Sequence, residues 1–482
     1  MNSVRIGRQG VAMKIRFALG FAAFLLMALP CVLRAQIDDA TKRLSHDIFK
    51  ELIEINTTDS VGSTTVAAKA LAKHLLDAGF PESDVQVLGP NDRKGNLVAR
   101  LHGTGAHKPI LFICHLDVVE ARREDWSLDP FKFTERDGYF YGRGTEDIKE
   151  GDAILITTFI RLKREGYKPD RDLILALTAD EEGGTANGVE WLVKNHRDLI
   201  DAEFVINPDA GDFEMDQGKR VLVGIQASEK LYADFQLEVH NKGGHSSLPE
   251  PDNAIYQLAE GLTRLERYTF PFELGEVTRA YFAKEADIVG GATGADMKAI
   301  ERTPPDEAAV ARLSKEPFYN ARLRTTCVAT RLDAGHANNA LPGTARAIVN
   351  CRILPGHTRD EIRAQLIKIL AEPEINVTPV ESTGTAYGEN PPSTLRPDVM
   401  GPLERVVQEM WPGVPVVPVL DAGASDGIHT RAAGIPTYGL PGVFIELNDD
   451  RSHGQDERLP VSSFYEGVDF YYRFTKALSS PQ

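Results

Sequence analysis

Cysteine, tryptophan and basic stretches are scarce in this chain. Its 482 residues include 4 cysteines and 3 tryptophans, and 70 acidic side chains outnumber 54 basic ones, for a net charge of -16. So few cysteines exclude a disulfide scaffold and a zinc site built from paired thiolates. The negative charge argues against a nucleic-acid partner and against a polybasic membrane partner. An acidic, well-solvated surface accounts for this charge, which therefore does not by itself indicate a metal site.

Long apolar runs are also rare. The one long run covers residues 17–29, follows four basic residues and precedes the small residue Ala35. A charged region, a short apolar region and a small residue follow one another in this order in export signals. We therefore expect residues 1–35 to be a signal peptide and the protein to be exported, either periplasmic or secreted. Whether the segment is cleaved or kept as an anchor stays open.

Three cysteines remain beyond that segment. Cys114 lies inside an apolar run and is expected to be a small buried residue. Cys327 and Cys351 could pair in an oxidising compartment, and the sequence leaves this open.

The first half of the chain alternates between strand-like and helix-like segments. Apolar residues have helical spacing over residues 44–79, 151–164 and 189–196, and short apolar strands are predicted at 96–101, 110–113, 173–177 and 204–206. This alternation is typical of an α/β layer structure with buried strands. The pattern returns after about residue 385 and ends in a helix over residues 463–477.

Between these parts the pattern changes, and the chain is too long for one ordinary core. Strands are predicted at 232–240 and 345–353 and helices at 253–265 and 359–370, which indicates a smaller α+β domain. We expect residues 36–226 and 384–482 to form one discontinuous domain and residues 227–383 a second domain inserted into it. Residues 268–320 have weak periodicity and are interpreted as an insertion within the second domain.

Polar clusters follow the predicted strands of the first domain. They are His115 with Asp117, residues 180–182, Asp209 and the late His453, while Asp147 opens a helix. Because strands of an α/β sheet converge on one crevice at their carboxyl ends, these side chains are expected to meet. Imidazole and carboxylate groups are the ligands of hydrolytic zinc sites.

The clusters, taken together and in this order, resemble the aminoacylase and carboxypeptidase family of two-zinc exopeptidases. The matching text is Cys-His-Leu-Asp at 114–117, Gly-Arg-Gly-Thr-Glu-Asp at 142–147, Asp-Glu-Glu-Gly-Gly at 180–184, and His453 with Asp-Glu-Arg at 456–458. The resemblance covers nearly all of the chain beyond the signal. It implies a three-layer α/β/α catalytic domain with an inserted, smaller α+β lid domain.

The resemblance also implies two divalent metal ions, with zinc favoured by the ligand types. His115 and Asp209 would hold one ion, Glu182 and His453 the other, and Asp147 would bridge both. A bridging carboxylate suits the short metal separation of two-metal sites.

Two acidic residues beside these ligands would act in catalysis. Asp117 would accept a hydrogen bond from the second ring nitrogen of His115 and fix its tautomer. Glu181 would be the general base that takes a proton from the attacking water and returns it to the leaving nitrogen.

The second domain and a late loop would bind substrate. His245, in Lys-Gly-Gly-His-Ser-Ser, matches the lid histidine that stabilises the oxyanion. Asn339 and Arg352 match the family's substrate-binding asparagine and arginine, and a guanidinium offers a terminal carboxylate two parallel donors. Ser425 lies in a loop that resembles the family's substrate-side loop.

Residues 324–356 and the insertion before them look most like the carboxypeptidase S subgroup. The predicted activity is hydrolysis of the amide bond next to a free carboxylate, in a small peptide or alternatively in an N-acyl amino acid. A third interpretation, a non-catalytic metal-binding protein, is disfavoured because all five ligand positions and Glu181 are present. The long insertion leaves open whether a homodimer forms through the lid domain.

Overall fold

A computed structural model describes residues 37–380 and 390–480 of the chain. The predicted signal peptide, residues 1–35, lies outside this part. Among the described residues, no helix combines the length and the apolar character needed to cross a membrane.

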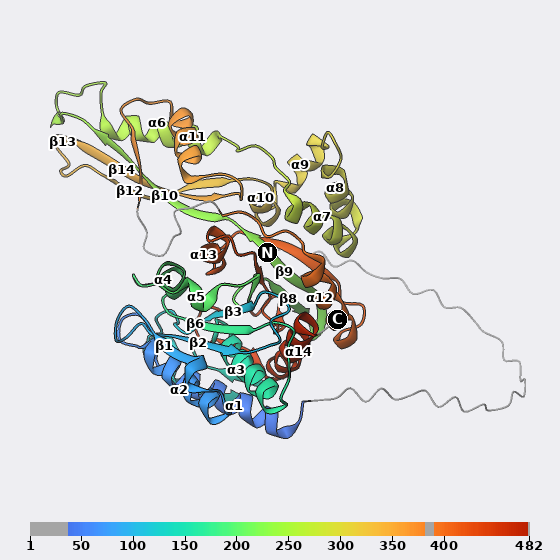
Figure 1. Ribbon diagram of the computed structural model, residues 1–482. Coiled ribbons are helices and arrows are strands. Elements are labelled where there is room, and N and C mark those ends of the chain that lie inside the picture. Colours follow the sequence, from blue (N-terminus) through green and yellow to red (C-terminus); the bar gives the residue numbers. More distant parts are fainter. Residues whose placement is uncertain (1–36, 381–389, 481–482) are drawn as a thin grey trace, which may run out of the picture. The chain divides into compact units, whose positions relative to one another are not determined.

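A large mixed sheet forms the centre of the first part of the fold (Figure 1). It has ten strands in the order β1-β2-β6-β3-β7-β17-β9-β8-β18, with β16 paired to β9. Their bounds are β1 Val85–Leu88, β2 Asn96–Leu101, β3 Ile110–His115, β6 Leu173–Thr178, β7 Phe204–Asn207, β8 Asp212–Asp216, β9 Lys219–Glu229, β16 Val416–Asp421, β17 Thr437–Gly439 and β18 Ile445–Glu446. The strands β6, β3 and β7 run parallel to one another.

Helices cover both faces of this sheet. One face carries α1 Asp39–Glu54, α2 Thr64–Asp77, α3 Lys149–Arg164, α12 Pro397–Met410 and α14 Val461–Ser479. The other face carries α4 Gly188–Asn195 and α5 Arg197–Ile200. Alternate side chains of β3 separate the two cores, because Phe112 enters the first and Ile113 the second. The predicted α/β class and the three-layer α/β/α arrangement are confirmed.

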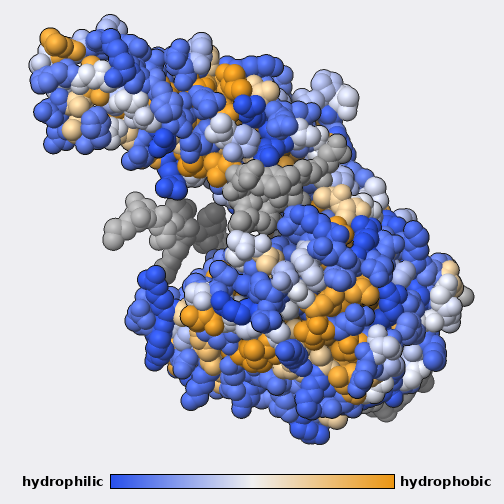
Figure 2. Space-filling model, turned by 60° about the vertical axis from the view of Figure 1, so that its left-hand side comes forward, coloured by the Kyte–Doolittle hydropathy of each residue, from blue (hydrophilic) through white to orange (hydrophobic). Residues whose placement is uncertain are grey.

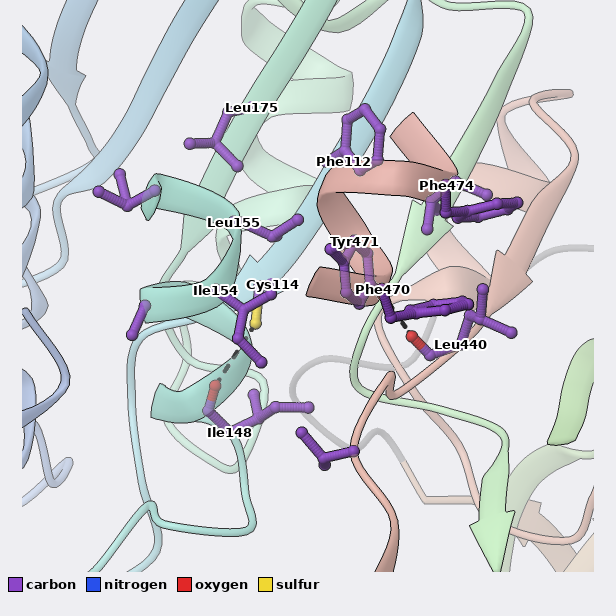
Figure 3. Close-up of a cluster of buried hydrophobic side chains, with 14 of the residues drawn as sticks. Phe112, Cys114, Ile148, Ile154, Leu155, Leu175, Leu440, Phe470, Tyr471 and Phe474 are labelled. Atoms are coloured by element: carbon purple, nitrogen blue, oxygen red, sulfur yellow. Dashed lines mark hydrogen bonds between the residues drawn. The ribbon is translucent and has the colours of Figure 1, made fainter. Parts of the chain in front are cut away.

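Cys114 belongs to β3, and its side chain lies in the first of these cores, which α3 and α14 also form (Figure 3). Its thiol lies 3.6 Å from the carbonyl oxygen of Ile148, and the hydroxyl of Tyr471 donates a hydrogen bond to the carbonyl of Leu440. Burial raises the pKa of the Cys114 thiol well above its usual value. The expectation that Cys114 is a buried residue is therefore confirmed.

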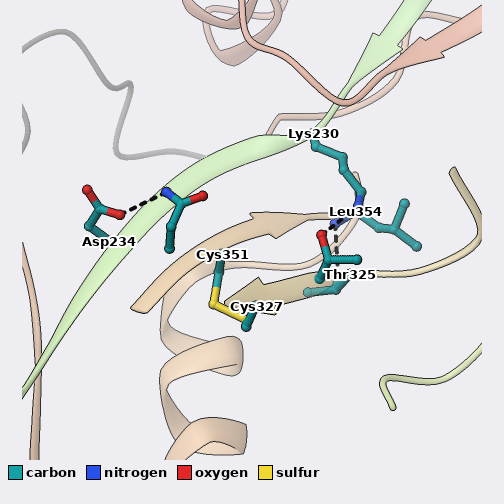
Figure 4. Close-up of a disulfide and its surroundings, with 8 residues drawn as sticks. Lys230, Asp234, Thr325, Cys327, Cys351 and Leu354 are labelled. Atoms are coloured by element: carbon teal, nitrogen blue, oxygen red, sulfur yellow. Dashed lines mark hydrogen bonds between the residues drawn. A yellow bond between two sulfur atoms is a disulfide. The ribbon is translucent and has the colours of Figure 1, made fainter. Parts of the chain in front are cut away.

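A second sheet has a hydrophobic core of its own. Its order is β12-β14-β10-β15, with bounds β12 Thr326–Ala334, β14 Thr344–Ile353, β10 Leu231–His240 and β15 Asn376–Pro379. The helices α6 Ala254–Arg267 and α11 Arg359–Leu370 pack against it. Cys327 and Cys351 lie directly opposite each other on β12 and β14, with their Cα atoms 4.1 Å apart, and form a disulfide (Figure 4).

The stretch between α6 and β12 contains four helices. They are α7 Glu276–Val289, α8 Gly291–Ile300, α9 Glu307–Leu313 and α10 Pro317–Leu323. Their core includes Leu222 of β9 and Val417 and Val419 of β16. The stretch interpreted as an insertion within the second domain therefore packs on the large sheet, which its weak periodicity did not reveal.

Short elements complete the described chain. They are the strands β4 Thr134–Arg136, β5 Tyr139–Tyr141, β11 Gly244–His245, β13 Ala340–Leu341 and β19 Arg458–Pro460, the helix α13 Gly427–Ala432, and the short 3-10 helices η1 Glu82–Asp84 and η2 Arg123–Asp125. The helical stretch predicted over residues 44–79 consists of two helices, because residues 55–63 form turns and extended backbone between α1 and α2.

One face of the molecule is mostly hydrophilic, in agreement with the acidic composition (Figure 2). Figure 2 shows one face, on which hydrophobic side chains form several separate groups between larger hydrophilic areas. The most exposed large apolar side chains include Val61 and Leu248, which are 77% and 72% exposed.

The disulfide leads to a prediction about stability. Cys327 and Cys351 are 24 residues apart in the sequence, and closing a loop of that size stabilises a fold by about 3 kcal/mol through restriction of the unfolded chain. We expect a thiol reductant to lower the urea midpoint of the wild-type protein and to leave that of the Cys327→Ala/Cys351→Ala variant unchanged. An equal effect of reductant on both proteins would show that this bond does not contribute.

Candidate metal centre

Three parallel strands end beside one another at the candidate site. β3 ends at His115, β6 is followed by residues 180–182, and β7 is followed by Asp209. Since β6, β3 and β7 are neighbours in this order, their carboxyl ends lie at the same edge of the sheet. The parallel pairing of these strands therefore brings together side chains that are far apart in the sequence.

His115 lies at the centre of this group and is 1% exposed. Its Nε2 atom is 3.2 Å from Oδ1 of Asp147 and 3.4 Å from Oδ1 of Asp209. The second imidazole comes from near the end of the chain: Nε2 of His453 lies 2.8 Å from Oδ2 of Asp147 and 2.8 Å from Oε1 of Glu182. Asp147 thus contacts both histidines through different oxygens, one on each side of the group.

Two observations indicate that these side chains are suited to bind a metal ion. The ligand atoms of His115, Asp147 and Glu182 lie within 4.8 Å of one another, and so do those of His115, Glu181 and Asp209. The buried Nε2 atom of His115 has no hydrogen-bond partner among the described residues, although it faces two carboxylates. A buried imidazole nitrogen without a partner is costly unless a cation or proton occupies that position. His115, Asp147, Glu182, Asp209 and His453 thus form a group able to bind metal, which we call the metal group.

The contacts of Asp117 differ from those that the sequence predicts. The atom that pairs with Nδ1 of His115 at 3.0 Å is the main-chain oxygen of Asp117, while its carboxylate is 3.9 Å away. That carboxylate accepts hydrogen bonds from the backbone N–H groups of Glu181 and Glu182, at 3.2 and 3.0 Å. Asp117 therefore fixes the His115 ring through its carbonyl, and positions the Glu181–Glu182 backbone through its side chain.

A buried carboxylate, Glu457, supports the loop that carries Asp147. It accepts hydrogen bonds from the backbone N–H groups of Gly144, Glu146 and Asp147, at 2.7–3.2 Å, and is paired with the guanidinium of Arg143. Gly144 has φ +91°, a conformation that strains any residue with a side chain. The Glu457 carboxylate, exposed to 0%, therefore satisfies the donors of a tight turn directly beside the metal group.

Asp180 anchors the Glu181–Glu182 loop on the opposite side. The ammonium of Lys94 donates to its carboxylate, and the N–H of Ala186 donates to the other carboxylate oxygen at 3.1 Å. Asp180 and His453 both have left-handed backbone, with φ of +59° and +61°. Such residues tend to occur at functional sites, where surrounding contacts hold the strained backbone.

The ionisable side chains of the metal group shift one another's pKa values. Hydrogen bonds to Asp147 and Glu182 raise the pKa of His453 to about 10. Burial opposes ionisation of Asp147, but the two imidazoles close to its carboxylate lower its pKa below the usual value. Burial raises the pKa of Asp209 to about 7 and, with the nearby Asp209 charge, raises that of Glu181 well above its usual value. Several carboxyl groups thus compete for few protons, an environment that favours a cation.

Glu181 differs from the other carboxylates in its contacts. Among the described residues its carboxylate has no hydrogen bond or ion pair, whereas Glu182 pairs with His453. A half-buried carboxylate without a partner beside the metal group has the geometry required of a general base.

The predicted lid residues lie on the second sheet and its extension. His245 on β11 is exposed, pairs in register with Ala340, and its Nδ1 contacts the hydroxyl of Ser247 at 2.7 Å. Asn339 is adjacent, and its carbonyl accepts the N–H of Ser246. In the described part of the chain, no hydrogen bond or ion pair connects either residue to the metal group.

Arg352 and Ser425 have partners within the protein. The guanidinium of Arg352 lies 4.7 Å from the centre of the Tyr232 ring and donates to the carbonyl of Ala422 at 3.3 Å. Ser425 is 5% exposed, and its hydroxyl donates to the buried carboxylate of Glu229. Arg352 thus lies next to the loop that precedes Ser425, while the Ser425 hydroxyl is engaged in a structural network.

Sequence reasoning missed several residues that shape the site. Lys94 follows a turn and resembles a surface charge, and Glu229 belongs to a strand, so neither carries a local signal. Glu457 was visible only as part of the Asp-Glu-Arg motif at 456–458. Its contact with the Asp147 loop spans more than 300 residues of the chain.

Several known proteins are similar to this chain in sequence. The sequence pattern of Peptidase family M20/M25/M40 matches residues 111–477. The chain is 28% identical over 387 residues to a "Probable carboxypeptidase S-like 2" of Dictyostelium discoideum, covering 77% of this chain and 71% of that protein. It is 29% identical over 387 residues to the human "N-fatty-acyl-amino acid synthase/hydrolase PM20D1", covering 78% and 75%.

Solved structures show the same fold at lower identity. The M20 family metallo-carboxypeptidase Sso-CP2 from Sulfolobus solfataricus superposes with a TM-score of 0.65 at 17% identity, covering 92% of this chain and 99% of that one. Human carnosine dipeptidase 1 superposes with a TM-score of 0.61 at 16% identity, covering 91% and 97%. Since the family pattern matches residues 111–477, most of the chain, this protein belongs to Peptidase family M20/M25/M40.

Proposed function

We propose that this protein is a metal-dependent exopeptidase that hydrolyses the amide bond next to a C-terminal residue with a free carboxylate. The observation that carries the proposal is the meeting of His115, Asp147, Glu182, Asp209 and His453 with one carboxylate, Glu181, left without a partner. A metallo-carboxypeptidase among the structural neighbours and a carboxypeptidase S-like relative support it.

The ligand set suits two divalent ions, and we propose zinc. His115 and Asp209 would hold one ion, Glu182 and His453 the other, with Asp147 between them. The bound ions would lower the pKa of a water molecule and polarise the substrate carbonyl.

The protein's own groups would then move the proton. Glu181 is positioned by the Asp117 carboxylate, which accepts its backbone N–H at 3.2 Å. Its carboxylate has no hydrogen bond or ion pair among the described residues, so it is available to accept a proton. It would accept the proton of the attacking water and deliver it to the leaving nitrogen.

The second sheet, with α6 and α11, would act as the substrate-binding lid. Arg352 would bind the substrate carboxylate through its guanidinium fork, with Asn339 beside it, and His245 would stabilise the oxyanion. These roles rest on the motif positions, since the described contacts of these residues lie within the second sheet and the adjacent loop.

N-acyl amino acid hydrolysis is the alternative function. It uses the same chemistry, and the human relative named as an N-fatty-acyl-amino acid synthase/hydrolase is as similar as the carboxypeptidase S-like one. Kinetic comparison of dipeptides with N-acetyl and long-chain N-acyl amino acids, using the metal-loaded protein, tests the two functions.

We also propose that the protein is exported. The order of charge, apolar run and small residue at the N-terminus supports this, and so does the Cys327–Cys351 disulfide, a bond that forms and persists in oxidising compartments. Fractionation of cells that produce the whole chain would test it.

The general base leads to the first activity prediction. Glu181→Gln keeps the size of the side chain but removes its basicity, so we expect kcat to fall by about 10²–10⁴-fold while metal content and melting temperature are retained. The matched control is Glu190→Gln, which alters an exposed ion pair with Lys194 and should have nearly full activity. Substantial turnover by Glu181→Gln would contradict the assigned mechanism.

The metal group leads to a second prediction. A chelator should abolish hydrolysis, and added zinc should restore it with two ions bound per chain by elemental analysis. Protons compete for the ligands, since hydrogen bonds to carboxylates raise the pKa of His453 to about 10, so metal affinity should increase as pH rises toward that value. His453→Asn should bind less metal, whereas His74→Asn, at a half-exposed position on α2, should behave as wild type. Metal-independent hydrolysis would rule the proposal out.

A further inference from the structure

The loop of residues 179–187, which carries Glu181 and Glu182, joins β6 to α4 and contains neither helix nor strand. Two of its residues have left-handed backbone, Asp180 with φ +59° and Gly184 with φ +102°. Irregular backbone of this kind keeps one conformation only where contacts with the rest of the fold hold it. The position of the Glu181 carboxylate therefore depends on what holds the two ends of this loop.

The carboxylate of Asp426 contacts both ends of the 179–187 loop. Its Oδ1 atom accepts a hydrogen bond from the side-chain amide of Asn187 at 2.6 Å. Its Oδ2 atom lies 3.2 Å from the hydroxyl of Thr178, the last residue of β6. All three side chains are buried, so water does not readily replace these contacts.

Asn187 also contacts the backbone beside the proposed general base. Its amide nitrogen lies 3.3 Å from the carbonyl oxygen of Asp180, which directly precedes Glu181. Its side-chain oxygen accepts the N–H of Glu190 and so caps α4. Since the amide group cannot turn without losing one of these bonds, Asp426 and the helix together fix its orientation.

Thr178 makes the corresponding contact at the start of the loop. Its hydroxyl lies 3.1 Å from the carbonyl oxygen of Cys114, which directly precedes His115. One hydroxyl has a single proton, so it donates either to this carbonyl or to Asp426. The ends of β3 and β6 and the Asp426 carboxylate therefore meet at this hydroxyl.

The main chain that carries Asp426 is itself fixed by a buried ion pair. Ser425 donates its N–H and its hydroxyl to the carboxylate of Glu229, at 3.0 and 2.9 Å. Glu229 is buried and pairs with the guanidinium of Arg431 at 2.8 Å. The Ser425 hydroxyl thus supports the residue that follows it.

Asp426 is close to the reacting groups as well as to the loop. Burial is the largest cause of the raised pKa of Glu181 and of Asp209, and the negative charge of Asp426 adds to it in both cases. A change at Asp426 therefore acts next to the proposed general base.

We propose that Asp426 is a positioning residue: by contacting Thr178 and Asn187, it keeps the 179–187 loop in the conformation that presents the Glu181 carboxylate to the attacking water. The inference rests on the proposed function, because it takes Glu181 as the general base. Misplacing a catalytic group by about 1 Å can lower a rate by about 10²-fold. Since other segments would bind the substrate, a positioning role predicts a lower kcat at nearly constant KM.

Two variants of Asp426 test this role. Asp426→Ala removes both contacts, so we expect kcat to fall by about 10–100-fold, with KM changed by less than about 3-fold and two zinc ions still bound. Asp426→Asn should keep kcat within about 3-fold of wild type, because its oxygen can accept from Asn187 and its amide can donate to the Thr178 hydroxyl. Asp77→Ala, which removes an exposed ion pair on α2, is the matched control and should have wild-type kcat.

A variant at the other end of the contact keeps the test decisive if Asp426→Ala folds poorly. Asn187→Ser retains a residue suited to cap α4 but removes the amide that donates to Asp426. It should show the same fall in kcat, and its effect should not add to that of Asp426→Ala in the double variant. Rates are measured per folded, zinc-loaded full chain, with alanyl-leucine and N-lauroyl-leucine as probes.

The outcomes separate this inference from the proposed function. Wild-type kcat in Asp426→Ala and Asn187→Ser, equal losses in Asp426→Ala and Asp426→Asn, additive effects in the double variant, loss of bound zinc, or a rise in KM at constant kcat would overturn the inference alone. A zinc-loaded wild-type protein that cleaves neither probe, nor any other dipeptide or N-acyl amino acid, would overturn the proposed function and the inference with it.

Discussion

The carboxylate of Glu457 joins two parts of the chain that are more than 300 residues apart. It neutralises Arg143 inside the protein and accepts the N–H groups of the turn that ends at Asp147. Asp147 in turn contacts both His115 and His453. Without this buried acceptor, the turn would leave several N–H groups unsatisfied, and the residue that contacts both halves of the metal group would have no fixed position.

A similar arrangement holds the opposite side of the group. The Asp117 carboxylate accepts the N–H groups of Glu181 and Glu182, and Lys94 holds Asp180 just before them. Each of these supporting side chains is charged and buried, which is costly unless its partners are present. The fold thus concentrates negative charge at one edge of the sheet, and that charge is suited to bound cations. A cavity beside Asp147 and Asp209 is also lined by acidic residues.

The second sheet is stabilised by different means. It has a separate core, and the disulfide links its edge strand β12 to β14. Arg352 follows Cys351 directly on β14, so the disulfide restricts the strand that carries the proposed carboxylate-binding side chain. The four helices α7 to α10 do not belong to this core but share theirs with β9 and β16 of the large sheet.

Local patterns along the chain predicted many of its elements correctly. The strand at residues 96–101 and the helix at residues 359–370 occur as predicted, because apolar periodicity reports which face of an element is buried. The same holds for the positions of His115 and Asp209, since polar residues after buried strands must lie at the sheet edge. Residues 276–323 were not recognised as helices, because their apolar residues pack on a sheet whose strands lie elsewhere in the chain.

The family motifs likewise indicated which side chains would meet, but not what supports them. The roles of Glu457, Lys94 and the Asp117 carbonyl depend on contacts between distant segments, for which a single sequence has no periodic signal. The pairing of Cys327 with Cys351 was open in the sequence and was decided by the register of β12 against β14. The sequence by itself thus determined the chemical groups and their order along the strands. Only the tertiary structure determined which residues line the acidic cavity and which hydrogen bonds hold the reacting groups. Both depend on distances between residues that are remote in the chain.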